Sequence, residues 1–295
     1  MSNNGNSNPF DISPEAADRL NQGMNLGGGI ELPFSAPVFW WLNGTAQSRP
    51  FAQTTPALYY GGWACNAEDI EAVLDDRGSL PGGLVETEIF TREGKNIPTY
   101  TSRALIIAPI GFRSCWTVGA RGAQTRSIQY VPGSRQHIQV LGLFGMRMPD
   151  GTYKSWGPIT LSAKGYQAQY LQSALKDWKK ALEKPRREHA PKVPAWAFWC
   201  ALGTFGANPE TSMVGKTGAQ SPVTPINLFV PKDITLDTMR KIYVGRAGVD
   251  EMADLQEEAD EWLNAWKNQT PAAAAASADD YPLEPVEPGE EEIPF

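Results

Sequence analysis

Histidine and cysteine are scarce in this chain, which has only two histidines and three cysteines among 295 residues. Neither His137 nor His189 stands at metal-ligand spacing from a cysteine or a carboxylate, so a zinc site and histidine-based catalysis are not expected. Cys65, Cys115 and Cys200 form no C-x-x-C pair, and their odd number favours buried free thiols over a disulfide framework. We expect a protein of a reducing compartment, without metal, cofactor or enzymatic activity.

Long apolar runs are also missing. No stretch reaches the roughly 20 apolar residues that cross a membrane, and the N-terminal residues lack a basic segment followed by an apolar one. A phosphate loop is missing too, because the pattern G-x-x-x-x-G-K-[ST] requires glycine where this chain has Glu210, ahead of Gly215 and Lys216. These absences predict a cytoplasmic protein without a membrane span and without nucleotide-hydrolysing activity.

Composition divides the chain into three parts. Residues 1–30 are rich in Asn, Gly and Ser, which favours a flexible N-terminal arm. Residues 31–268 hold the aliphatic and aromatic residues that a core needs. Residues 269–295 are rich in proline and acids, which predicts a disordered, extended tail.

Short β-like runs separated by glycine and proline fill the first half of the middle part. They read "PVFWWLNG", "ALYYGGW", "LVETEIFTR", "TYTSRALIIAPIGF", "HIQVLGLFGMRM" and "TYKSWGPITL". A helix is predicted near residues 164–184, because apolar residues recur there at intervals of three and four and Pro185 ends the pattern.

Two strand candidates, "AWAFWCALGTF" and "TPINLFV", follow that helix, and two further helices come after them. The second, acidic helix has one apolar stripe, formed by Met252, Leu255, Ala259, Trp262 and Trp266. This order predicts an α+β fold, mainly antiparallel β, built as an OB-like barrel with an inserted helix and C-terminal helices. Several other small β barrels are compatible with the same order.

Acids are nearly missing from residues 95–176, which hold ten Lys and Arg residues and one acid, Asp150. Aromatic residues are interleaved with these bases. A single strand of nucleic acid offers phosphates to cations and unstacked bases to rings, so the pattern is typical of a single-strand binding groove. The predicted nucleic-acid contacts are Arg103, Arg113, Trp116, Arg121, Arg126, Tyr130, Arg135, Phe144, Arg147, Lys154 and Trp156.

The alternative interpretation of these residues is structural. A tryptophan in a strand belongs to a core more often than to a stacking platform, and arginines in hairpins often only face solvent. The near absence of acids favours binding, because a merely solvated surface usually mixes both signs of charge. The glycine-rich stretch 112–137, which includes Trp116 and Tyr130, predicts a flexible flap over a bound strand.

The printed sequence closes in "EEEIPF". From Asp279 onward there are seven acids and no base, and without them the remaining 26 acids equal the 26 Lys and Arg residues. The net charge of −7 therefore belongs to this stretch. An acidic stretch that ends in Ile-Pro-Phe resembles the C-terminal tip of bacterial and bacteriophage single-stranded DNA-binding proteins, closely over about the last six residues.

The resemblance implies that the tip recruits proteins of replication, recombination or repair. The residues it assigns to this partner site are Glu290, Glu291, Glu292, Ile293, Pro294 and Phe295. A terminal phenylalanine presents a ring and a carboxylate together, which suits a pocket with an apolar floor and a basic rim. The family's usual N-terminal strand motif and Gly/Gln-rich linker are not found here, so we expect a divergent version encoded by a bacteriophage or plasmid.

These observations predict a sequence-independent single-stranded DNA-binding protein of a bacterial cell or a bacteriophage-infected host. It would protect single-stranded DNA and recruit partners through its tip. Two alternatives stay open: a single-strand annealing or recombination mediator, and an adaptor that mimics the tip without binding DNA. A homo-oligomer is compatible with each of them, and the preference for DNA over RNA rests on the tail resemblance.

Overall fold

The computed structural model describes residues 31–90, 95–118, 125–216 and 219–267. The predicted N-terminal arm and Arg121 of the predicted flap lie outside these residues. The predicted partner site lies outside them as well: Glu290, Glu291, Glu292, Ile293, Pro294 and Phe295.

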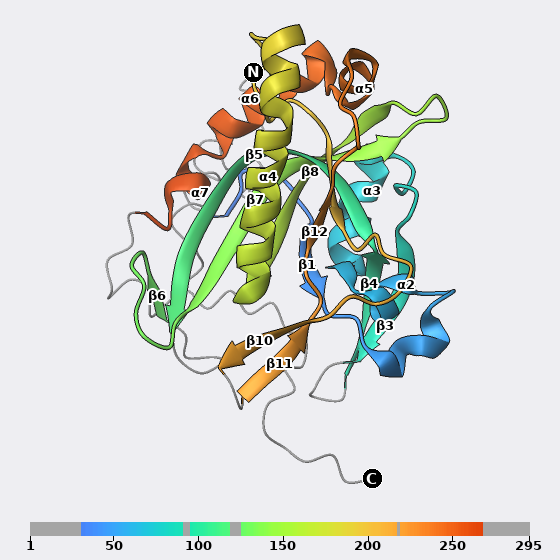
Figure 1. Ribbon diagram of the computed structural model, residues 1–295, viewed down its shortest axis with the longest axis vertical. Helices are drawn as coiled ribbons and strands as arrows, with labels where there is room; N and C mark the ends of the chain where they lie inside the picture. Colours follow the sequence, from blue (N-terminus) through green and yellow to red (C-terminus); the bar gives the residue numbers. More distant parts are fainter. Residues whose placement is uncertain (1–30, 91–94, 119–124, 217–218, 268–295) are drawn as a thin grey trace, which may run out of the picture.

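A mixed α+β structure forms around one ten-stranded, strongly curled sheet, shown in Figure 1. Its path runs β12-β9-β5-β7-β8-β1-β2-β4-β3, and β6 pairs with β5 beside this path. Strands β1 and β8 are parallel neighbours, whereas the other neighbours are antiparallel. The coarse prediction of an α+β fold with a mainly antiparallel sheet is confirmed. The strands are β1 (Val38–Leu42), β2 (Gly62–Asn66), β3 (Val85–Phe90), β4 (Asn96–Ser102), β5 (Ala104–Val118), β6 (Thr125–Ser127), β7 (Arg135–Arg147), β8 (Tyr153–Lys164), β9 (Cys200–Gly203) and β12 (Asn227–Phe229), with a separate hairpin of β10 (Ser212–Lys216) and β11 (Ala219–Val223).

The curl of the sheet brings strands that are far apart in its order into contact. Trp63 on β2 donates its indole N–H to the carbonyl of Leu202 on β9 at 2.9 Å, and both side chains are fully buried. Trp41 on β1 donates likewise to the carbonyl of Thr224, just after β11, at 2.9 Å. These bonds satisfy the polar edge of each ring inside the core, where an unpaired donor would be costly.

Strand β7 is buried on both faces, which explains its nearly continuous apolar sequence. Ile138 and Val140 point into the core beneath α4 (Tyr166–His189). Leu141 and Leu143 point to the other face, beneath α6 (Gly245–Glu258) and α7 (Asp260–Asn264). The predicted apolar stripe of the last helices is confirmed, because Met252, Ala259, Trp262 and Trp266 are buried and Leu255 is half-buried.

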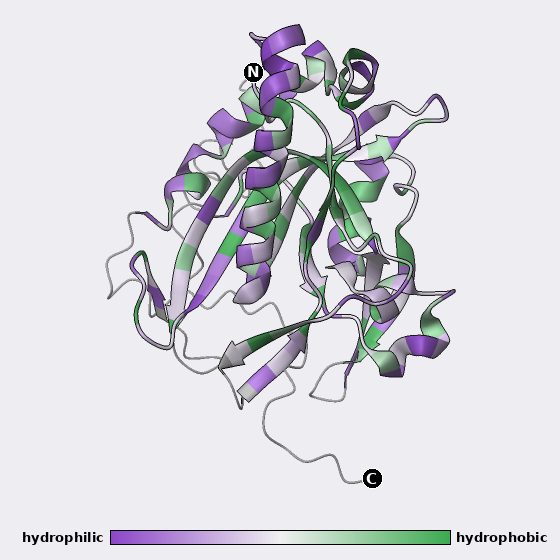
Figure 2. Cartoon of the chain, in the orientation of Figure 1, coloured by the Kyte–Doolittle hydropathy of each residue, from purple (hydrophilic) through white to green (hydrophobic). Residues whose placement is uncertain are grey.

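Helix α4 buries the predicted stripe of Leu171, Leu175, Trp178 and Leu182, and its hydropathy varies around the helix accordingly (Figure 2). The prediction that Pro185 ends this helix is wrong, since the helix continues to His189. Proline keeps a helical φ, so its cost is confined to one missing hydrogen bond and a local clash. The guanidinium of Arg186 donates to the carbonyls of Pro191 and Val193, which secures the chain beyond the last turn.

Several short helices were not predicted. The stretch "ALYYGGW" was predicted as one strand, but Pro56–Tyr60 forms helix α2 and Gly62 begins β2. Proline favours the first turn of a helix, and Gly61 ends this one at a φ of 85°, which glycine adopts readily. The other elements are η1 (Ala46–Phe51), α3 (Ala67–Arg77) and α5 (Leu236–Ile242), the last at a site where a helix was expected.

Cys65, Cys115 and Cys200 are buried and free, which confirms the prediction made from their spacing. Burial raises the pKa of the Cys65 and Cys200 thiols, so both stay protonated. Within the described ranges, no helix has the length and apolar character that crossing a membrane requires.

Candidate functional site

Arg113 was predicted to contact nucleic acid, but the structure places it inside the protein at 5% exposure. Its guanidinium carbon lies 3.9 Å from the ring centre of Trp262 and 4.4 Å from that of Trp266. Its Nε–H donates to the side-chain oxygen of Gln139 at 2.8 Å. Arg113 therefore fastens α7 and the residues after it to the sheet. Arg126, at 8% exposure, lies over the Trp266 ring as well.

Phe144 and Trp156 belong to the core, as the structural interpretation expected for such rings. Each is 4% exposed, and the two rings meet edge to face with centres 5.8 Å apart. The Trp156 N–H donates to the carbonyl of Ser79, and the guanidinium of Arg77 covers the indole ring. We do not carry these two rings into a binding surface.

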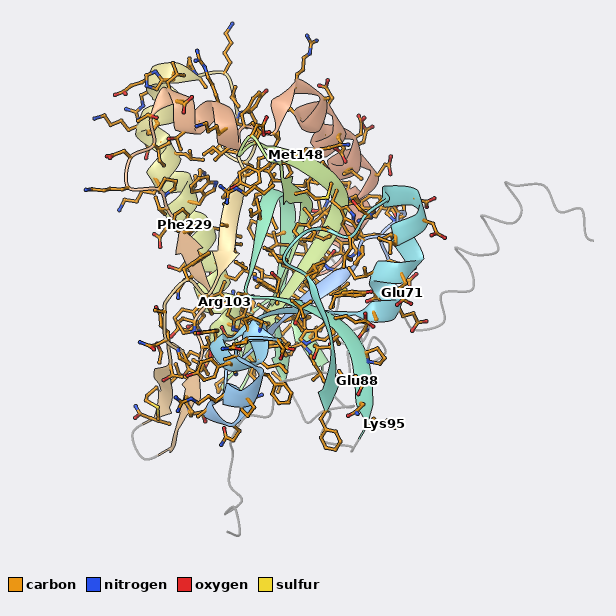
Figure 3. The ribbon with its side chains drawn as sticks, turned by 90° about the vertical axis from the view of Figure 1, so that its right-hand side faces the viewer. Glu71, Glu88, Lys95, Arg103, Met148 and Phe229 are labelled. Carbon is orange, nitrogen blue, oxygen red and sulfur yellow. The ribbon has the colours of Figure 1, made fainter. Side chains whose placement is uncertain are left out.

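Arg103 has a structural role in this conformation. Its guanidinium lies 4.0 Å above the ring of Tyr60 and donates to the carbonyl of Gly206 at 2.7 Å. Figure 3 shows Arg103 far from Lys95 and Glu88, which lie near the tip of β3 and β4. The ten bases of residues 95–176 are thus spread over the molecule.

Arg135, Arg147 and Lys154 are exposed, but the structure does not bring all three together. Arg135 begins β7 and Arg147 ends it, so they are roughly 40 Å apart along a strand with about 3.3 Å per residue. Lys154 lies beside the end of β7, because its residue pairs with Met146.

Three rings do gather on one surface, which we call the ring strip: Phe112, Trp116 and Tyr130. Trp116 and Tyr130 meet edge to face with centres 5.0 Å apart, and Tyr130 is 62% exposed. Phe112 is 56% exposed and lies four residues before Trp116 on β5. Side chains alternate along a strand, so both point to the same face, roughly 13 Å apart. The strip offers exposed aromatic faces along the margin of the sheet.

A cavity of about 700 Å³ opens beside Phe112, between β5, α4 and the helices α6 and α7. Its floor is apolar and is formed by Ile110, Val140, Leu175, Met252 and Leu263. Each of these floor residues is no more than 9% exposed, so the floor is part of the packed core. The half-buried Trp196 and three amide side chains, Gln172, Gln256 and Asn264, complete the wall.

Three lysines and one acid, Asp260, line the cavity, which gives it a positive balance. Lys176 and Lys179 are exposed on α4, and neither has a carboxylate within ion-pair distance among the described residues. Lys267 donates to the side-chain oxygen of Asn264 at 2.8 Å, and Asn264 donates in turn to a carboxylate oxygen of Asp260 at 2.9 Å. This chain of hydrogen bonds holds the Lys267 ammonium at the rim.

The sequence interpretation did not select these cavity residues. A local signal exists on α4, where Gln172, Lys176 and Lys179 are spaced by four and three residues and must share one helix face. That face borders the buried stripe of Leu171 and Leu175. No comparable signal exists for Lys267, which reaches the cavity because α7 packs on β5.

His137 lies behind this site, on the face of β7 that α7 covers. Its ring is 4.9 Å from that of Trp266, and its Nε2 is 3.0 Å from the hydroxyl of Ser162. Burial, and then the charges of Lys164, Arg126 and Arg113, hold its pKa well below the usual range. The imidazole is neutral and serves the packing of α7.

Comparison of the chain with protein-family models, with curated proteins and with solved structures found no match. In the part of the chain that the structure describes, no group of three or more His, Cys, Asp or Glu side chains is placed to hold a metal ion. The ring strip and the adjoining cavity are the site that the geometry singles out.

Proposed function

We propose that this protein binds single-stranded DNA without sequence preference and recruits replication, recombination or repair proteins through its acidic tail. One observation carries the proposal: an exposed strip of three rings leads to a cavity bordered by three lysines. Stacking of a base on a ring contributes about 1–3 kcal/mol whatever the base, and lysines pair with phosphates of any sequence. Both contacts suit sequence-independent binding.

The curled sheet supports this proposal as an OB-like platform, with the strand bound along β5 and β6. The tail adds the second half of the function. Its seven acids, together with Ile293, Pro294 and Phe295, suit a partner pocket with an apolar floor and a basic rim. Protection of the strand and recruitment then belong to separate parts of one chain.

A titration at two salt concentrations tests the proposal. Labelled oligo-dT, an oligo-U RNA and double-stranded DNA of equal length are added to the full chain. We expect oligo-dT to bind more tightly than the duplex and to lose affinity steeply with salt, because each phosphate contact releases counterions. Absence of salt-dependent binding to any of the three probes would contradict the proposal.

A second candidate is an adaptor that carries the tip without binding DNA. The burial of Arg113, Arg126, Phe144 and Trp156 favours it, because these predicted contacts serve the core instead. An adaptor would capture tail-binding partners with full affinity while the titration above shows no oligonucleotide binding.

A further inference from the structure

We propose that the cavity beside Phe112 takes one unstacked nucleotide of the bound strand, its base on the apolar floor and its phosphates at the three lysines. This inference rests on the proposed function and deepens it. It names the place where a strand is anchored and the reason why a duplex is excluded.

The dimensions and lining of the cavity suit a nucleobase. Its volume of about 700 Å³ lies within the range of small-ligand sites, about 300–1,000 Å³. The floor offers aliphatic side chains to the flat face of a base, and Phe112 and Trp196 offer rings at its border. Base and cavity thus bury apolar surface together.

The polar groups of the wall suit any base. Gln172, Gln256 and Asn264 each carry a donor and an acceptor on one side chain. An amide of this kind accepts from or donates to the edge of a purine or a pyrimidine alike. The lining therefore predicts binding without base preference, in agreement with the proposed function.

Charge complementarity selects a phosphate-bearing ligand. Lys176, Lys179 and Lys267 stand against the single carboxylate of Asp260. Two of these lysines lie on α4 and the third at the end of α7, so they border the cavity from opposite sides. Phosphates on either side of an inserted base would each meet an ammonium group.

Insertion of a base also explains selectivity for single strands. A paired base reaches the cavity only after it has left the duplex, which costs a few kcal/mol. A base of a single strand carries little of this cost. The ring strip lies on the same face of β5 as Phe112, so a strand that stacks on Trp116 is led toward the cavity.

The test uses variants of the full chain that fill the cavity or remove its charge. Ala253 is exposed on α6 and lines the cavity, so Ala253→Phe narrows it without disturbing the core. Ala247→Phe is the matched control, because Ala247 is exposed on the same helix and does not line the cavity. Lys176→Gln with Lys179→Gln removes charge, and Lys180→Gln with Lys184→Gln is its control on the same helix. Thermal unfolding verifies that each variant is folded.

Two probes separate base from phosphate: labelled oligo-dT, and a strand of equal length whose nucleotides lack bases. We expect Ala253→Phe to weaken oligo-dT binding roughly 5–150-fold relative to its control, the loss of one stacked base. The same variant should leave binding of the abasic strand unchanged. The double lysine variant should weaken both probes and reduce the salt slope by about 1.4, since each single-strand phosphate contact contributes about 0.7.

Three outcomes would overturn the inference, and they differ in what else they affect. Equal oligo-dT affinity of Ala253→Phe and Ala247→Phe would refute the cavity site and leave the proposed function standing. No oligo-dT binding by the unaltered chain would refute both. Binding of a labelled peptide of residues 279–295 that Ala253→Phe abolishes, with oligo-dT binding retained, would assign the cavity to the acidic tail.

Discussion

The guanidinium carbon of Arg113 lies 3.9 Å above the indole ring of Trp262. Arg113 is on β5 and Trp262 on α7, and Arg113 also donates through Nη1 to the carbonyl of Trp262 at 3.3 Å. This contact sets the position of α7, and α7 in turn carries Leu263 and Asn264 to the cavity. An arginine that looks like a phosphate contact in the sequence is thus part of the framework of the site.

Arg113→Ala should lower the free energy of unfolding by about 3 kcal/mol. It removes a charged hydrogen bond to Gln139 and cation–π contacts with two tryptophans, and it leaves a gap in the core. Urea unfolding measures the change. Arg147→Ala is the control, because Arg147 is exposed and its loss should stay within about 0.5 kcal/mol. Equal effects of the two substitutions would show that Arg113 does not fasten α7.

The protein should lose stability as the pH falls below about 6.5, the ordinary pKa of histidine. The pKa of His137 is lowered in the folded protein, so the unfolded chain binds the additional proton first and acid favours unfolding. The slope due to one such group is at most about 1.4 kcal/mol per pH unit. Urea unfolding at about pH 7.5 and 5.5 measures it.

His137→Gln should flatten this profile relative to the unaltered chain. His189→Gln is the matched control, since His189 is exposed and should leave the profile as it is. Because Glu251, whose pKa burial raises, changes stability in the opposite direction, the comparison is made between variants at each pH. An unchanged acid slope in His137→Gln would assign the loss to other groups.

Trp116→Ala and Tyr130→Ala should each weaken oligo-dT binding by about 1–3 kcal/mol, the contribution of one stacked base. The two rings touch, so the double variant should lose less than the sum of the single losses. Fluorescence titration at fixed salt measures the affinity. Phe90→Ala provides the comparison, because Phe90 is 71% exposed on β3, at the opposite end of the sheet path. A loss of the same size in Phe90→Ala would indicate a general surface effect.

Deletion of residues 279–295 should tighten oligo-dT binding at low salt and abolish the capture of tail-binding partners. The deleted stretch carries seven acids, which compete with phosphates for the same lysines. Phe295→Ala keeps these charges, so it should abolish capture and leave oligo-dT affinity unchanged. The competition idea fails when the truncated and full chains bind oligo-dT equally at low salt.

The three thiols should be inert in the folded protein at about pH 8. All are buried, and burial raises the pKa of Cys65 and Cys200, so little reactive thiolate forms. A thiol reagent followed by absorbance should show reaction only as urea unfolds the chain. Rapid reaction of one equivalent without urea would reveal an accessible cysteine.

Local patterns carried much of the fold. The helical period of α4 and the stripe from Met252 to Trp266 could be predicted because each depends on residues within a few turns of one another. The short helices α2 and α3 escaped prediction. In α2, proline and glycine signals within a few residues outweigh the β propensity of two tyrosines.

The faces of β5 show why the site could not be predicted in full. An extra residue, Ile110, forms a bulge between Pro109 and Gly111, and it reverses which alternate residues face α4. Ile107 lies on the α4 face before the bulge, and Phe112 lies on it afterwards, so Arg113 turns inward to Trp262 and Phe112 outward to the cavity. Alternation in the sequence does not reveal where such a shift occurs.

The sequence by itself determined the buried thiols, the amphipathic helices and the charge of the tail, because these follow from residue types and short-range periodicity. The tertiary structure decided which bases and rings remain available. Trp262 and Trp266 come from about 150 residues further along the chain than Arg113, and their packing withdraws that arginine from the surface. The same packing brings Lys267 to a cavity that Lys176 and Lys179 line from another helix, a meeting that no local pattern specifies.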